Sequence, residues 1–396
     1  MRVFLGAFGQ PGHAFPMLAL GARLVERGHS VTFETWSRWR ECVEAAGMTF
    51  VAAPEYPVLP TRERPLKPYQ AVVPAAAETR RAMRRAQPDV VVHDILTLAP
   101  TLAAELEGLP AATLIPHVYP APERGFPPYA FGARLPRTRL GRMLWRSLER
   151  PVAAGVRRGR DELNETRSRL GLERVERTFG GVSDRLCIVG TFPQLEYPRA
   201  WPGHTHVVGP IMWEPPFGDV APPPGSEPLV LIAPSTAQDP EHRLLRAAVR
   251  GLAREPVRVL ATWNRRAVRE PLCVPPNARL VEWLSYSRTM PRCALVVCHA
   301  GHGTLVRALA SGCPVLAVPH AGDMSENAAR VDWAGVGIRL PWRLLTPLAL
   351  RTAVRRALVE PRFASRAREL AAWAAARDPL AHACSLVEGL APGPRS

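Results

Sequence analysis

The segment 295–327 constrains the fold of this chain more than any other stretch. It opens with an apolar run, LVVC, that has the length and composition of a buried parallel strand, and a second such run follows at 315–318. Between the two runs lie a turn with two glycines and a helical spacing of apolar residues that stops at Gly312. A strand, a glycine-rich turn, a helix and a strand in this order predict one βαβ unit of an α/β domain.

The turn 299–304 has the chemistry of a phosphate site. Glycines at 301 and 303 let backbone N–H groups approach a phosphate, and a helix N-terminus adds about half a positive charge. We therefore expect a diphosphate to bind here without a metal. The alternative is an ordinary βαβ unit with a tight turn. The histidine before the turn and the Gly322-Asp323 pair after the next strand favour the phosphate site.

The first half of the chain also alternates strands and helices. Apolar runs at 3–7, 30–33 and 88–94 predict buried strands, and the apolar spacing at 17–24 predicts a helix. We expect a helix over 34–48 and an irregular proline-rich segment over 52–75. Because parallel strands present their carboxyl ends at one edge, the loop that carries His13 should lie at the ligand-binding edge of this sheet.

A linker divides the chain into two domains. Residues 209–228 (GPIMWEPPFGDVAPPPGSEP) break the patterns on both sides, and their prolines make the segment semi-rigid. The predicted domains are therefore 1–208 and 229–372. A C-terminal helical segment over 373–396 follows, and the helix over 364–387 is expected to break near Pro379.

The net charge of +16 raises the question of nucleic-acid binding. Arginine supplies nearly all of it, since Lys67 is the only lysine, and the arginines are scattered rather than blocked. No nucleic-acid-binding motif is visible, so we do not expect such a partner. The seven cysteines form no CxxC pair, which fits free thiols in a reducing cytoplasm, and no stretch of ~18 apolar residues predicts a membrane span.

The pattern HxGxGT at 299–304, then ALxxGxPV at 308–315 and PxxGDxxxNA at 319–328 resembles the donor-binding signature of family 1 glycosyltransferases. The resemblance covers essentially the whole chain. It implies the GT-B fold, in which two Rossmann-like domains face each other across a cleft and the C-terminal helix crosses back to the N-terminal domain. It further implies an enzyme that moves a sugar from a nucleotide diphosphate to a small molecule.

Gly12-His13-x-x-Pro16 matches the family's N-terminal motif, whose histidine is the catalytic base. Such a base removes the proton of an acceptor hydroxyl as the new bond forms. Asp94 matches the carboxylate that orients this histidine and stabilises the imidazolium. As alternatives, Asp94 could cap the helix expected from residue 98, and a loop histidine could be a capping or exposed residue. His93 should face the other side of the strand.

The resemblance also assigns a donor site in the second half. Trp283 falls where the family keeps an aromatic that stacks on the nucleotide base, and we group Ser285 with it. Ser235 or Thr236 would bind phosphate, although a capping role for the helix over 240–253 is equally compatible with the sequence. The remaining donor residues are predicted to be His299, Gly301, Gly303, Thr304, Asp323 and Met324.

The acceptor site is expected in the first half. A loop after the strand over 111–115 carries prolines and aromatic residues, which suit a rigid apolar wall. Its candidate acceptor residues are His117, Phe126, Tyr129 and Phe131. For His117 a structural role in the loop is an equal alternative. His204-x-His206 could chelate a metal, but no further ligand accompanies it, so no metal site is predicted.

Two residues depart from the family pattern. Many members keep a glutamate for the ribose hydroxyls at the position of Arg307, and arginine cannot accept a hydrogen bond. The position of a glutamine that holds sugar hydroxyls is Met324. Both changes favour a dTDP-linked deoxysugar over UDP-glucose as the donor.

These observations together predict an inverting, metal-independent glycosyltransferase that uses a dTDP- or UDP-sugar and an apolar phenolic, polyketide or macrolide-like acceptor. We expect no cofactor, a cytoplasmic monomer or homodimer, and no stable membrane insertion. A nucleotide-sugar epimerase shares the fold but needs no apolar acceptor pocket. A non-catalytic relative that binds a nucleotide sugar or activates a partner would not need His13, Asp94 and His299 together.

Overall fold

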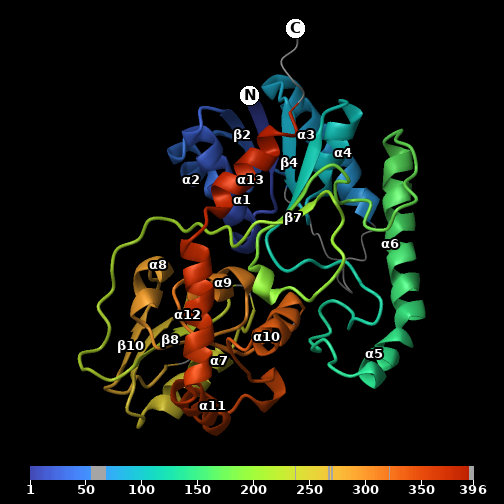
Figure 1. The fold of residues 1–396 in the computed structure, drawn as a ribbon. Helices are drawn as coiled ribbons and strands as arrows, with labels where there is room; N and C mark the ends of the chain where they lie inside the picture. Colours follow the sequence, from blue (N-terminus) through green and yellow to red (C-terminus); the bar gives the residue numbers. More distant parts are fainter. Residues whose placement is uncertain (55–67, 237, 266–267, 269–270, 321, 392–396) are drawn as a thin grey trace.

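Two parallel β-sheets, one in each half of the chain, form the framework of the molecule (Figure 1). The computed structural model describes all residues except 55–67, 237, 266–267, 269–270, 321 and 392–396. Of the segment 52–75, which was expected to be irregular, residues 55–67 lie outside the described residues. The expectation is wrong for 68–75, because the helix α3 spans Pro68–Ala86. Within the described chain the α/β prediction is confirmed, because every strand pairing in both sheets is parallel.

The first sheet has seven strands in the order β3-β2-β1-β4-β5-β6-β7. Its central strand β4 is buried along its whole length, as expected for a parallel strand covered by helices on both faces. The strands are β1 Arg2–Gly6, β2 Ser30–Thr35, β3 Thr49–Ala52, β4 Val90–Asp94, β5 Ala111–Ile115, β6 Cys187–Val189 and β7 Thr205–Val207. The helices are α1 Pro11–Glu26, α2 Arg40–Ala45, α3 Pro68–Ala86, α4 Leu98–Leu106, α5 Arg139–Arg146 and α6 Glu149–Arg169.

The second sheet has six strands in the order β10-β9-β8-β11-β12-β13. Its middle strands β8 and β11 are fully buried, and the predicted unit over 295–327 is present as β11, α9 and β12. The strands are β8 Leu229–Ala233, β9 Arg258–Thr262, β10 Ala278–Val281, β11 Leu295–Cys298, β12 Val315–Ala317 and β13 Gly337–Arg339. The helices are α7 Arg243–Leu252, α8 Tyr286–Thr289, α9 His302–Ala310, α10 Asp323–Ala334, α11 Pro347–Val359, α12 Pro361–Ala375 and α13 Pro379–Glu388.

The chain returns to the first half through its last helix. α12 lies along the second half, and α13 packs beside α1 in the first half (Figure 1). Apolar residues of α13 enter the core that contains Leu20 and Leu24, and Arg27 of α1 donates to the Glu388 carboxylate at 2.6 Å. The predicted crossing helix is confirmed, and it breaks where Pro379 begins α13.

The chain passes between the halves at two places that lie side by side. Residues 209–228 contain no helix or strand, and residues 376–378 join α12 to α13. Gly209 has φ +113, and a Cβ there would meet Pro379 at 2.9 Å and Trp373 at 3.3 Å. Only glycine accommodates both the backbone conformation and the close approach of the two crossing segments.

A buried arginine also crosses between the halves. Arg330 of α10 donates to the carbonyl of Leu195 at 3.0 Å and pairs with Glu326 at 2.8 Å and Glu196 at 3.4 Å. Its guanidinium lies 3.4 Å from the centre of the Tyr197 ring. Because removing one partner of such a pair leaves an uncompensated buried charge, this contact fixes how α10 meets the first half.

The expectation of a helix over 34–48 is wrong for part of that range. β2 continues through Thr35, a short 3₁₀ turn covers Ser37–Trp39, and the α-helix spans Arg40–Ala45 only. Glu34 points into the protein, where its carboxyl group accepts from the Thr79 hydroxyl at 2.9 Å. Burial raises the pKa of Glu34 to about 8, so tertiary contacts override its helix propensity.

Gly337 offers a test of the β12–β13 contact. A Cβ at this position would lie 1.8 Å from the backbone carbonyl oxygen of Val315. We expect Gly337→Ala to destabilise the protein by about 1–3 kcal/mol or more, because backbone cannot move aside as a flexible side chain can. The measurement is the midpoint of urea unfolding.

Gly155→Ala is the matched control, since it lies in α6 and a Cβ there meets no atom within 4 Å. This variant should gain up to about 1 kcal/mol from helix propensity. An unchanged midpoint for Gly337→Ala would contradict the packing argument.

Candidate functional site

A cavity of about 270 Å³ lies between the two halves, at the carboxyl ends of both sheets. Open α/β sheets bind ligands at this edge. Predicted site residues from both halves line it: His13, His117, Ser235, Thr236, Trp283, His299, Gly301, Gly303, Thr304, Asp323 and Met324. The cavity is also lined by residues that the sequence analysis did not predict, among them Gln10, Phe15, Trp213, Glu214, Asn264, Tyr286 and His302.

His13 and Asp94 meet at this cavity because β1 and β4 are neighbours in the sheet. His13 lies in the first turn of α1, and its Nδ1 is 2.6 Å from Asp94 Oδ1. Asp94 is 1% exposed and also accepts from the Phe8 backbone N–H and the Thr97 hydroxyl, both at 3.3 Å. With the carboxylate holding Nδ1–H, Nε2 of His13 keeps its lone pair.

Burial by itself would lower the pKa of His13, but the charge and hydrogen bond of Asp94 outweigh it and raise the pKa above 6.5. The Asp323 carboxylate, from the opposite side of the cavity, contributes in the same direction. His93 points into the core instead, where its Nε2 lies 2.8 Å from the Thr113 hydroxyl and burial lowers its pKa to about 4. His93 therefore has no access to the cavity.

The N-terminus of α9 forms the opposite wall. Gly301 is the N-cap residue of this helix, and no side chain caps it. A Cβ at Gly301 would lie 2.3 Å from Nε2 of His299, whereas a Cβ at Gly303 would meet nothing within 4 Å. Glycine thus lets the histidine ring lie against the turn, and the open space over Gly303 gives a ligand access to the helix N–H groups.

His299 is held in this wall by its Nδ1, which lies 3.3 Å from the carbonyl oxygen of Ala233. Burial lowers the pKa of His299, so the ring is neutral at pH 7. A neutral ring that donates through Nδ1 presents a lone pair at Nε2. His299 can therefore stabilise a bound anion only after it takes up a proton, which a diphosphate beside it would favour.

Ser235 and Thr236 follow β8 and also line the cavity. Neither residue caps the helix that follows, so the capping alternative is wrong. That helix, α7, begins at Arg243, and the Asp239 carboxylate accepts from the Arg243 backbone N–H at 2.9 Å. The Ser235 hydroxyl accepts from the Gln238 N–H at 2.8 Å. Asp323 begins α10 after Gly322, whose φ of +61 turns the chain into the helix.

Glu214 of the linker lies in the cavity wall beside Arg307, the position at which many family members keep the ribose glutamate. Its carboxylate accepts from the hydroxyls of Ser285, at 2.6 Å, and Ser287, and lies 3.9 Å from Arg307. Arg307 in turn donates to the Trp213 carbonyl at 2.9 Å. Ser285 does not line the cavity, because its hydroxyl caps α8 and binds the Glu214 carboxylate. No periodicity in the linker sequence marks Glu214, so sequence analysis missed it.

The aromatic loop after β5 contributes two of the four acceptor candidates to the cavity region. His117 lines the main cavity and also an adjoining apolar hollow of about 300 Å³, which Tyr129 lines as well. Phe126 packs against Tyr197 instead, and Phe131 is 66% exposed. Phe126 and Phe131 line neither space.

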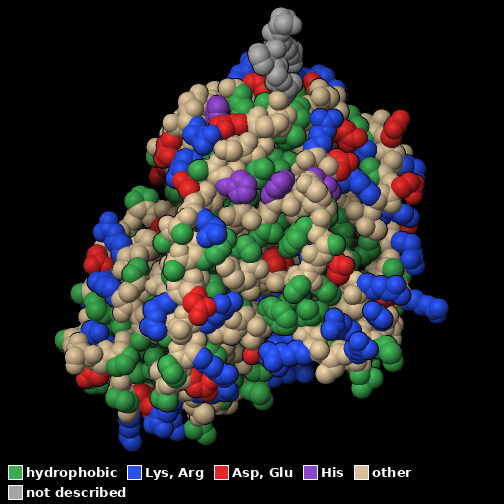
Figure 2. All heavy atoms as spheres, viewed as in Figure 1, with side chains coloured by type: hydrophobic (Ala, Val, Ile, Leu, Met, Phe, Trp, Pro, Cys, Tyr) green, Lys and Arg blue, Asp and Glu red, His purple; other side chains and the backbone are tan. Residues whose placement is uncertain are grey.

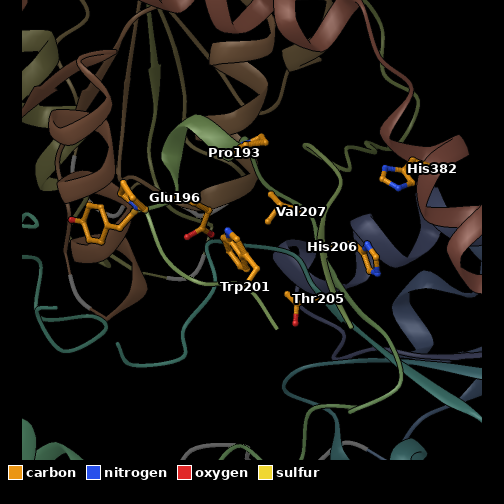
Figure 3. Close-up of a pocket in the computed structure, with 9 residues that line it drawn as sticks. Pro193, Glu196, Trp201, Thr205, His206, Val207 and His382 are labelled. Carbon is orange, nitrogen blue, oxygen red and sulfur yellow. The ribbon is translucent and has the colours of Figure 1, made fainter. Parts of the chain in front are cut away.

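A second hollow, of about 530 Å³, shares no lining residue with the main cavity (Figure 3). His206 of β7 and His382 of α13 lie on its rim, with 6.5 Å between their ring centres. Within the described part of the chain no group of three or more metal-ligating side chains occurs. Nor does any helix among the described residues have the length and apolar character needed to span a membrane.

Comparisons with known proteins identify relatives of this chain. Residues 246–387 match the family model described as Erythromycin biosynthesis protein CIII-like, C-terminal domain. The chain is 30% identical to 4'-demethylrebeccamycin synthase of Lentzea aerocolonigenes, with 98% of this chain and 99% of the relative covered. It is also 30% identical to O-mycaminosyltylonolide 6-deoxyallosyltransferase of Streptomyces fradiae, with 98% and 97% covered.

Solved structures share the fold. The glycotransferase of kitacinnamycin superposes with a TM-score of 0.79 at 21% identity, covering 99% of both chains. The glycosyltransferase VinC, solved in complex with dTDP, superposes with a TM-score of 0.69 at 22% identity, covering 98% of this chain and 99% of VinC.

The contact between His13 and Asp94 can be tested by NMR titration of the imidazole. We expect Asp94→Asn to lower the pKa of His13, because the charge that outweighs burial is lost. In the wild type the raised pKa adds stability below pH 6.5, and this contribution is lost as the pH rises through the folded-state pKa. In Asp94→Asn this pH dependence should be weaker.

Asp89→Asn is the matched control, since Asp89 lies at the other end of β4 and accepts from the Arg2 backbone N–H at 2.7 Å. It should leave the His13 titration unchanged. Equal pKa values of His13 in the wild type and Asp94→Asn would contradict the assigned contact.

Proposed function

The chain belongs to the family 1 glycosyltransferases of natural-product biosynthesis, which have the GT-B fold, and from that premise we propose an inverting, metal-independent reaction. The donor is a dTDP- or UDP-linked sugar, and the acceptor is a hydroxyl group of an apolar small molecule of phenolic, polyketide or macrolide-like type. The observation that carries the proposal is the lone pair of His13 Nε2 opposite the N-terminus of α9 in one cavity.

In this proposal His13 is the general base. Its Nε2 takes the proton of the acceptor hydroxyl while the oxygen attacks the anomeric carbon of the sugar. The imidazolium that forms is stabilised by Asp94, which is held by two further hydrogen bonds and does not need to move. Because the base and the diphosphate site lie on opposite walls, the attack is opposite to the leaving group and the anomeric configuration inverts.

The departing diphosphate develops negative charge beside α9. The free N–H groups after Gly301 and the positive end of the helix stabilise this charge without reorganisation. His299 adds a charge-assisted hydrogen bond once it is protonated. These groups do what a divalent cation does in other transferases, so the proposed reaction needs no metal.

The apolar hollow beside His117 is the proposed acceptor site. Ile95, Phe179 and Val182 line it together with Tyr129, so it favours a flat apolar molecule. Nδ1 of His117 lies 2.8 Å from the Val118 carbonyl, and burial lowers the pKa of His117, which leaves a neutral ring. Its centre is 6.1 Å from the centre of the His13 ring, so an acceptor in the hollow reaches the base.

We place the enzyme in the cytoplasm as a monomer or homodimer. All seven cysteines are free thiols, which fits a reducing compartment. Burial raises the pKa of five of these thiols to about 11 or 12, so these five are unreactive.

The test of the base is turnover of nucleotide sugars by the wild type and His13→Ala against phenolic and macrolide acceptors. We expect kcat to fall by about 10²–10⁴ in the variant, as for loss of a general base. Each assay is run with and without EDTA, and equal rates are expected.

His206→Ala is the control variant, because His206 lines the separate hollow and should leave turnover unchanged. Full activity of His13→Ala would contradict the assignment of the base. A rate that requires added Mg²⁺ would contradict metal independence.

The donor preference is a second test. Arg307, in place of the ribose glutamate, is already paired with the linker, and the nearby Glu214 carboxylate is engaged by the hydroxyls of Ser285 and Ser287. Met324 cannot hold sugar hydroxyls. We therefore expect a higher kcat/KM for dTDP-linked deoxysugars than for UDP-glucose, measured with one acceptor. The dTDP complex of VinC and the deoxyallosyl donor implied by the name of the Streptomyces relative support this choice. A strong preference for UDP-glucose would overturn it.

A further inference from the structure

Helix α5 exposes its apolar face. Leu140 is 73% exposed, Met143 62% and Leu144 68%. Their spacing of three and four residues places them on one side of the helix, where in most globular proteins such a stripe faces the core. Phe131, 66% exposed, adjoins the helix through its ring contact with Trp145. These four side chains are called the α5 apolar face below.

The orientation of the helix is built in rather than accidental. The Thr138 hydroxyl caps α5 by accepting from the Gly141 N–H at 3.1 Å. A Cβ at Gly141 would lie 2.6 Å from Pro136, so this side of the helix lies close to the preceding loop. Trp145, on the same side, is half-buried against Phe131. The side that carries Gly141 and Trp145 is therefore the one that holds the helix on the protein.

Arginines flank the α5 apolar face. Arg139, Arg142 and Arg146 share the neighbouring side of the helix and are exposed, and α5 contains no acidic residue. Arg137 and Arg150 are exposed just before and after it. Figure 2 shows hydrophobic and basic side chains next to one another over this helix, at the lower right. Figure 1 shows α5 at the edge of the molecule, away from both sheets.

We propose that α5 docks the enzyme on an anionic lipid surface. A basic amphipathic helix of this kind lies in the plane of the interface, with its apolar side chains among the acyl chains and its arginines at the phosphate groups. Two observations favour a lipid surface over a protein partner. α5 carries arginines and no acidic residue, whereas the core of a protein interface is depleted in charge. The helix also lies at the edge of the molecule, where a flat surface can reach it (Figure 1). One helix of eight residues gives weak, reversible binding.

Docking would bring the acceptor entrance to the membrane. A single loop runs from His117, in the cavity wall, through Tyr129 of the apolar hollow to Phe131 and α5. Apolar acceptors concentrate in a bilayer, so an enzyme held there meets them at a higher local concentration. This consequence rests on the proposed function, whereas the docking itself does not.

The test is co-sedimentation of the full chain with vesicles of phosphatidylcholine alone and with vesicles that also contain phosphatidylglycerol. We expect binding to the anionic vesicles, weaker binding at high salt, and little binding to phosphatidylcholine. The double variant Leu140→Gln/Leu144→Gln should bind at least tenfold more weakly. Arg142→Gln/Arg146→Gln should lose about fivefold for each arginine.

Leu344→Gln/Leu348→Gln is the matched control, because these leucines are 60% and 61% exposed on the second half of the molecule. It should bind vesicles as the wild type does. Circular dichroism and turnover of a water-soluble acceptor should be unchanged in every variant, which separates a failure of docking from a failure of folding or of the proposed function.

Three outcomes would overturn the proposal. The first is no binding of the wild type to anionic vesicles at low salt, and the second is equal binding of the wild type and Leu140→Gln/Leu144→Gln. The third comes from analytical ultracentrifugation: a dimer that this double variant dissociates, without vesicle binding, would assign the α5 apolar face to a second copy of the chain.

Discussion

The hydrogen bond between His13 and Asp94 depends on the strand order of the first sheet. The two residues are 81 positions apart, and they meet because β4 pairs directly with β1, with Gly6 opposite His93. The loop after β1 and the end of β4 then lie at the same edge. The chain adds β2 and β3 on the other side of β1 and returns through α3 to β4, so β1 and β4 stay adjacent. The geometry of the proposed base and its carboxylate is thus a product of topology.

The same principle governs the second half. β8 and β11 are neighbours, so the loop after β8, with Ser235, and the turn after β11, with His299 and Gly301, form one wall. Each half supplies part of the cavity. The buried contacts of Arg330 and the packing of α13 on α1 therefore matter to the chemistry, because they set the distance between the two walls.

The sequence predicted eleven of the residues that line the cavity, since strand, turn and helix patterns locate strand ends well. Gly301, which comes before a helical spacing, is one example, and the end of the buried strand β4 likewise located Asp94, the partner of His13. The cavity residues Trp213 and Glu214 were missed because a linker has no periodicity that fixes where its side chains point. Phe126 and Phe131 also lie in a loop without periodicity, and they line neither space. Glu34 was assigned to a helix because propensity ignores the buried partner Thr79.

The two chain crossings have a mechanical consequence. Gly209 contacts Trp373 and Pro379, so the outgoing and returning segments pass through nearly one point. Beyond it, Glu214 and Arg307 fasten the linker to the second half, which leaves only a few residues free to bend. The crossing point and the buried contact of Arg330 therefore join the two halves at two separate places. The cavity lies between the halves, so a change at either place alters the spacing of its walls.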